Sequence, residues 1–154
     1  MPFFLSPDAR LWDRIRTRQS APRLAAEVAG FAASEFIILV SSVKEAFAAH
    51  LESSEFTSYV MTDGDAAGAL IRFGTGRESS ARMLQALRAD DESETSLDAE
   101  FLVKDAFGFE RVTLIGVSNE RVRDEVKALV AEAGFRARVA VYPPWFRRAE
   151  ESGL

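Results

Sequence analysis

The last third of the chain contains the pattern that most constrains the fold, which is a strand, a helix and a second strand in succession. Residues 112–117 are mostly apolar and predict a buried strand, after which Ser118 and Asn119 favour the start of a helix. That helix is expected to end at Gly134, and residues 135–142 alternate between apolar and polar side chains as a half-buried strand does. The segment therefore predicts a β-α-β unit with two parallel strands in one sheet.

The helix of this unit carries one apolar stripe. Its members are Val122, Val126, Leu129, Val130 and Ala133. This spacing is typical of a helix that packs on a sheet. We therefore expect Leu129 to be buried, so that its replacement by alanine would cost about 2–5 kcal/mol of stability.

Earlier segments predict further strands and helices for the same sheet. Apolar runs and an intervening Asp-Gly turn predict three strands, at 36–40, 56–62 and 69–73. Helical spacing and capping residues predict one helix that begins near Pro7. They predict four further helices, over 22–33, 43–53, 77–89 and 97–107. The predicted fold class is α+β (an α/β sandwich), with a single mixed sheet of about five strands, helices packed on it and two N-terminal helices.

The chain has 154 residues, which is a usual length for one domain. We expect a single domain that consists of an N-terminal helical segment over 1–34, a sheet core over 35–142 and a tail over 143–154.

The most suggestive local motif is the glycine turn over residues 72–77, where a predicted strand ends and a helix begins. Glycines allow backbone N–H groups to face a ligand, the helix start adds partial positive charge, and arginines can bind phosphate oxygens. The residues predicted to bind a small anionic ligand are Arg72, Gly74, Thr75, Gly76 and Arg77. The alternative is a plain turn that is capped by Ser79 or Thr75, with Glu78 paired to an arginine.

Few other residues suggest catalysis, and no catalytic residue is assigned. The chain has no cysteine and one histidine, His50, whose spacing from Phe47 places it on or beside a buried helix face. Asp63 and Asp65 flank a glycine, but the spacing of a calcium loop is missing. Turn chemistry explains this pair better, and no metal site is predicted.

Charge gives an expectation about partners. The chain has 24 acidic and 19 basic side chains, and its net charge of -5 is the wrong sign for a generic nucleic-acid binder. Eight acidic residues and one lysine lie between Asp90 and Glu110. We expect that segment to be exposed and to attract a protein partner that carries positive charge.

The apolar run at the N-terminus is too short for a signal peptide or a membrane span. Together with the absence of cysteine, this predicts a soluble, cytoplasmic protein with no membrane partner.

From Arg72 to Phe135 the chain is similar to the GNAT-type N-acetyltransferases, whose strand-loop-helix binds the pyrophosphate of acetyl-CoA. The matching pieces are Arg72, Gly74, Gly76, Arg77, the strand over 112–117, Asn119 and the pair Gly134-Phe135. Val126 stands where that family has a tyrosine acid. The resemblance implies an acyl-CoA-dependent N-acyltransferase with acetyl-CoA as its cofactor.

Two functions therefore stay open at the level of sequence. The first is a non-catalytic α/β binding module without a cofactor, which acts through protein–protein contacts or a small anionic ligand. The alternative is the GNAT-like acyltransferase, and whether the protein is an enzyme is left uncertain.

Overall fold

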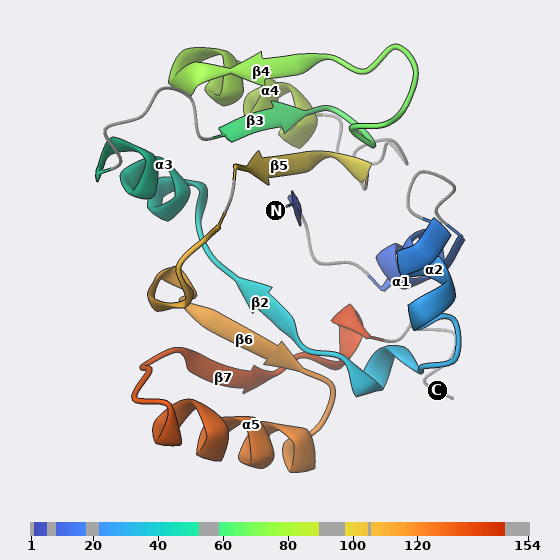
Figure 1. Ribbon diagram of the computed structural model, residues 1–154, viewed down its shortest axis with the longest axis vertical. Helices are drawn as coiled ribbons and strands as arrows, with labels where there is room; N and C mark the ends of the chain where they lie inside the picture. The colour runs from blue at the N-terminus through green and yellow to red at the C-terminus, as the bar shows by residue number, and fades with distance from the viewer. Residues whose placement is uncertain are drawn as a thin grey trace. The chain divides into compact units, whose positions relative to one another are not determined.

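A computed structural model describes residues 2–5, 9–17, 22–52, 59–89, 98–104 and 106–146 (Figure 1). The chain divides into two compact units, and neither is continuous in sequence. Unit 1 contains Met1–Ser6 and Val43–Phe107, and unit 2 contains Pro7–Ser42 and Gly108–Leu154. Each unit is described by itself below.

Unit 1 is built around a four-stranded antiparallel sheet with the order β1-β5-β3-β4. Its strands are β1 (Pro2–Phe4), β3 (Tyr59–Thr62), β4 (Phe73–Thr75) and β5 (Glu100–Val103). Its helices are α3 (Val43–Glu52) and α4 (Gly76–Ala89). Figure 1 shows α4 beside β3 and β4, and α4 contacts both strands.

One face of this sheet forms the core of unit 1. The buried residues are Tyr59, Met61 and Phe101, and the Tyr59 and Phe101 rings stack with centroids 5.1 Å apart. Partly buried residues of α3, α4 and β1 pack on them, among them Phe47, Met83 and Phe3. Because side chains alternate along a strand, the neighbouring residues of β3 and β5 lie on the opposite face.

Unit 2 contains a three-stranded sheet with the order β2-β6-β7, in which β2 and β6 are antiparallel and β6 and β7 are parallel. Its strands are β2 (Ile38–Val40), β6 (Leu114–Val117) and β7 (Arg138–Val141). Its helices are α1 (Arg10–Thr17), α2 (Pro22–Val28) and α5 (Glu120–Glu132), with short 3-10 helices at Ala33–Glu35, Phe109–Arg111 and Pro143–Trp145.

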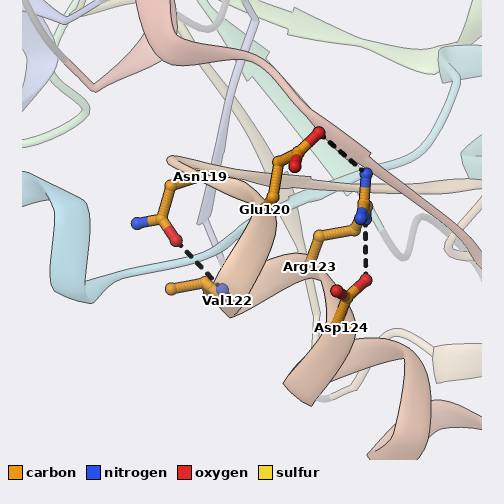
Figure 2. Close-up of polar contacts among 5 residues, drawn as sticks. All are labelled: Asn119, Glu120, Val122, Arg123 and Asp124. Atoms are coloured by element: carbon orange, nitrogen blue, oxygen red, sulfur yellow. Dashed lines mark hydrogen bonds and ion pairs between the residues drawn. The ribbon is translucent and has the colours of Figure 1, made fainter.

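The start of α5 has the cap that its sequence predicts. Asn119 Oδ1 accepts a hydrogen bond from the Val122 N–H at 3.0 Å, and Arg123 contacts both Glu120 and Asp124 on the exposed surface (Figure 2). The helix ends before Gly134, which has a φ of +75°. The predicted β-α-β unit with parallel strands is therefore confirmed.

Aromatic side chains connect distant segments within unit 2. The Trp12 indole N–H donates to the Trp145 carbonyl at 2.9 Å, and the Trp12 ring stacks on Phe36. A Cβ atom added to Gly116 would lie 2.5 Å from the Trp145 ring. Glycine in β6 is therefore required for the close approach of this ring to the sheet.

The mixed α+β class is confirmed, but the strands form two sheets instead of the single sheet that was expected. The helix expected over 97–107 is wrong, because Glu100–Val103 forms β5 and pairs with β1 and β3. Phe101, Leu102 and Val103 are aromatic, apolar and β-branched residues that suit a strand between two partners. Strand β1 itself was not expected, and its three residues are too few for a periodic signal.

The apolar stripe of α5 is correct at three positions and wrong at Leu129 and Ala133, which are exposed. Val122, Val126 and Val130 pack on the core of unit 2, whereas the Leu129 side chain is 65% exposed. With 3.6 residues per turn, steps of four residues move Val126 and Val130 to one side of Val122, and a step of seven moves Leu129 to the other side. Among the described residues, no helix is long and apolar enough to cross a membrane.

Candidate functional site on the second face of the unit 1 sheet

The second face of the unit 1 sheet brings polar side chains from three strands together. Thr62 pairs with Phe73 in β4, and Val60 pairs with both Thr75 and Leu102. Residues that pair directly across antiparallel strands have side chains on the same face. Glu100, one step beyond the last pair of β3 and β5, is opposite Thr62, so Glu100, Thr62 and Phe73 form a row across β5, β3 and β4.

Glu100 and Thr62 are both buried, with 1% and 0% of their surface exposed. The Glu100 N–H donates to Thr62 Oγ1 at 3.1 Å, and the Thr62 hydroxyl donates to the Gly64 carbonyl at 2.6 Å. Glu100 Oε2 accepts a hydrogen bond from the Ala66 N–H at 3.3 Å. A buried carboxylate requires such polar contacts. The loop that begins after β3 supplies two of these groups.

This loop, residues 63–72, is closed by Asp63 and Arg72. Asp63 Oδ1 accepts from the Arg72 N–H at 2.9 Å, and Asp63 Oδ2 accepts from Arg72 Nε at 2.5 Å. Burial raises the pKa of the Asp63 carboxyl, but the hydrogen bonds and the charge of Arg72 outweigh burial, so the pKa lies below its usual value. Both loop ends are thereby fixed beside Glu100.

The middle of the loop is a turn around Asp65. Asp65 Oδ1 accepts from the Ala67 N–H at 3.0 Å, and the Asp65 carbonyl accepts from the Gly68 N–H at 2.7 Å. Ile71 packs under the turn, where a Cβ atom at Gly64 would lie 2.8 Å from its Cδ1. Asp63 and Asp65 therefore have the turn contacts that the sequence favoured for them.

The end of the loop and the first residue of β4 present three exposed side chains. Leu70 is fully exposed, with a φ of +65°, and Phe73 is 55% exposed. The Arg72 side chain is 80% exposed although its Nε contacts Asp63. Exposed apolar and cationic side chains thus lie within four residues of each other, beside the row that contains Glu100.

The structure places the five residues of the predicted anion-binding turn in different surroundings. Arg72, Thr75 and Arg77 are exposed, whereas Gly74 is buried in β4. The Gly74 carbonyl accepts a hydrogen bond from the Ser80 hydroxyl at 3.3 Å. Gly76, with a φ of +78°, begins α4.

This turn is compatible both with the predicted anion site and with the plain capped turn. Glu78 contacts Arg82 at 3.4 Å within α4, as the plain-turn alternative suggests. The charge of Arg77 lowers the pKa of Tyr59, although burial has the larger effect and the pKa stays above its usual value. Ligand binding by Arg72, Gly74, Thr75, Gly76 and Arg77 therefore stays a prediction.

Sequence reasoning missed Thr62 and Glu100. Glu100 was assigned to an exposed acidic segment, but Ala99, Glu100 and Phe101 are all buried. A single acid among Ala99, Phe101, Leu102 and Val103 is the signal that could have identified it, because an acid in an apolar strand is seldom buried without a purpose. Residues 90–97 and 105 of that segment, and the His50 side chain, lie outside the described parts of the chain.

Comparisons with known proteins give a family. The family model described as "DarT: ssDNA thymidine ADP-ribosyltransferase, DarT" matches residues 1–147. Thermus sp. 2.9 DarT in complex with carba-NAD+ is 25% identical, with a TM-score of 0.70, and the match covers 96% of this chain and 72% of that chain. No curated protein matches the chain.

Two further structures of Thermus sp. 2.9 DarT are similar. In the complex with ADP-ribosylated ssDNA the identity is 25% and the TM-score 0.71, and the match covers 95% of this chain and 68% of that chain. The complex with NAD+ is 23% identical, with a TM-score of 0.70 and coverages of 95% and 71%, and shows the shared fold.

These matches overturn several expectations about function. The non-catalytic binding module with a positively charged protein partner is wrong, and so is the GNAT-like acyltransferase, because the matched family is described as ADP-ribosyltransferases. The predictions of no cofactor and of acetyl-CoA are wrong, since the similar Thermus sp. 2.9 DarT is in complex with carba-NAD+. The exclusion of nucleic acid is wrong as well. It was based on net charge, which does not describe how charge is distributed over a surface.

Proposed function

Because the chain belongs to the DarT family of ssDNA thymidine ADP-ribosyltransferases, we propose that it transfers ADP-ribose from NAD+ to thymidine in single-stranded DNA. The family match over residues 1–147 carries this proposal. The complexes of Thermus sp. 2.9 DarT with carba-NAD+ and with ADP-ribosylated ssDNA support both substrates.

The reaction makes defined demands on the protein. The bond between ribose C1′ and the nicotinamide nitrogen breaks, and nicotinamide leaves with the electron pair. A new bond forms between C1′ and the one thymine ring nitrogen that carries a hydrogen, and that nitrogen loses its proton. The site must therefore stabilise positive charge on the ribose and provide a group that accepts a proton.

Glu100 is the residue that we propose for these roles. Its carboxylate is buried on the face that also carries Thr62 and Phe73, and a carboxylate acts more strongly on developing positive charge where water is excluded. The Thr62 hydroxyl fixes the Glu100 backbone, and the Ala66 N–H orients the carboxylate. The Ala66 contact, at 3.3 Å, is long for a hydrogen bond.

Replacement of Glu100 by glutamine tests this role directly. Glutamine keeps the size of the side chain and an oxygen that can accept from the Ala66 N–H, but it removes the negative charge. We expect Glu100→Gln to lower the rate of ADP-ribosylation about 10²–10⁴-fold with little loss of stability. The assay is mass spectrometry of a thymidine-containing oligonucleotide after incubation with NAD+, beside an oligonucleotide without thymidine.

Glu125→Gln is the matched control, because Glu125 lies on the exposed surface of α5, where it pairs with Arg121. It should leave the rate unchanged. If the folded wild-type protein adds no mass of ADP-ribose to any thymidine-containing oligonucleotide, the proposed function is wrong. If the wild type is active and Glu100→Gln is equally active, only the role of Glu100 is wrong.

A further inference from the structure

Large apolar side chains are exposed to solvent where the 63–72 loop meets β4. Leu70, Arg72 and Phe73 expose a branched apolar chain, a guanidinium and an aromatic ring within four residues. Large exposed apolar side chains that lie together commonly indicate a binding surface. We define these three residues as the loop-tip surface.

Leu70 adds an argument from backbone strain. A φ of +65° favours glycine or asparagine and is costly for leucine. Its side chain is fully exposed, so packing within the described structure does not offset that cost. A strained residue whose side chain points into solvent is best explained by contact with another molecule.

The position of Phe73 indicates which molecule contacts these side chains. Phe73 pairs with Thr62, whose hydroxyl oxygen accepts from the Glu100 N–H, so the ring lies on the sheet face of Glu100. Adjacent strands lie about 4.8 Å apart, which puts Phe73 two strand spacings, about 10 Å, from Glu100. A single-stranded DNA that presents its thymidine to Glu100 would carry its next nucleotides over β4.

We propose that the loop-tip surface binds the single-stranded DNA next to the reacting thymidine. A neighbouring base stacks on the Phe73 ring, Leu70 covers its edge, and Arg72 binds a phosphate with the guanidinium nitrogens that face solvent. Aromatic side chains beside cations are the usual means of binding single-stranded nucleic acid without sequence preference. This inference rests on the proposed function.

The test is DNA affinity measured by fluorescence anisotropy with a labelled thymidine-containing oligonucleotide. We expect Phe73→Ala to weaken binding about 5- to 100-fold, the usual effect of losing one stacked base. Phe73→Trp should retain wild-type affinity because it preserves stacking, whereas Phe73→Leu should lose it although it remains apolar. Phe31→Ala is the matched control, since Phe31 lies in unit 2 and is 51% exposed.

Leu70→Asn separates binding from stability. Asparagine tolerates a positive φ, so this variant should melt at the same temperature as the wild type or higher, yet bind DNA more weakly. The KM for NAD+ should not change in Phe73→Ala or Leu70→Asn.

Two results would overturn the inference while the proposed function stands. One is wild-type DNA affinity in Phe73→Ala and Leu70→Asn, and the other is full affinity in Phe73→Leu, which would show that the ring does not stack. If the wild-type protein neither binds single-stranded DNA nor modifies it, the proposed function fails together with the inference.

Discussion

Asp63 closes the loop beside Glu100, and its ionisation should control the stability of that loop. Its pKa in the folded protein lies below the ordinary value. The carboxylate therefore stabilises the fold above the pKa of an unfolded aspartate, about 3.9, and this stabilisation is lost as the pH falls through the lower folded-state value. Arg72 is largely exposed, so solvent limits the effect to about 1 kcal/mol.

Asp63→Asn should thus lower the free energy of unfolding at pH 7, and the difference from the wild type should shrink below about pH 4. Urea denaturation of both proteins across that range measures it. Glu132→Gln is the control, because Glu132 is an exposed acid at the end of α5. A constant difference between wild type and Asp63→Asn at every pH would contradict the role of the charge.

Glu100 shows why single residues of the site were hard to predict. The sequence places it among acids, and charge counting treats it as one of them, although three-dimensional pairing puts it between β1 and β3. Arg72 could be proposed from its own chemistry, as a cation beside glycines, and its binding of a ligand stays a prediction. A carboxylate whose role depends on a strand far away in sequence has no comparable local pattern.

The exposed position of Leu129 in α5 gives a prediction at the scale of the element. Leu129→Ala should cost less than about 1 kcal/mol, because its side chain is mostly in solvent already. Val126→Ala, on the packed side of the same helix, should cost about 1–3 kcal/mol. Thermal unfolding of the two variants compares them, and equal losses would show that Leu129 is buried by something outside the described residues.

The turn between β4 and α4 supports a second prediction at this scale. Arg77 is exposed in the first turn of α4, where partial positive charge also favours a phosphate group. If this turn binds the pyrophosphate of NAD+, Arg77→Ala should raise the KM for NAD+ about tenfold without changing the melting temperature of the free protein. Arg82→Ala, on the same helix, is the control. The plain-turn alternative predicts no change in KM for Arg77→Ala.

Elements were predictable where their signals were local. The β-α-β unit of 112–142 has caps, a helical stripe and alternating strands within one continuous segment, and the structure contains it. Strand β5 was mistaken for a helix because its four residues follow polar residues, and its identity depends on pairing with β1 and β3. The division of the strands between two sheets has the same origin, since no local pattern indicates which strands pair.

At the scale of the whole molecule, each unit combines two segments that are far apart in sequence. Unit 1 combines Met1–Ser6 with Val43–Phe107, and its strand β1 is held by β5 and by the Phe3 ring against Phe107. Phe3→Ala should therefore destabilise the unit 1 sheet by about 1–3 kcal/mol, since Phe3 is partly buried. Hydrogen exchange of the β5 amides should accelerate, and Phe31→Ala should leave them protected. Unchanged β5 exchange in Phe3→Ala would show that β1 contributes little to the sheet.

The strand order β1-β5-β3-β4 also sets a schedule for synthesis on the ribosome. Pro2 pairs with Leu102, so β1 leaves the ribosome long before its partner β5 has been translated. At about 5–20 residues per second, that delay lasts roughly 5–20 s. During it, the hairpin of β3 and β4 exposes the edge that β5 will cover, which is the kind of surface that chaperones protect. The nascent chain is therefore most vulnerable to aggregation just before β5 emerges.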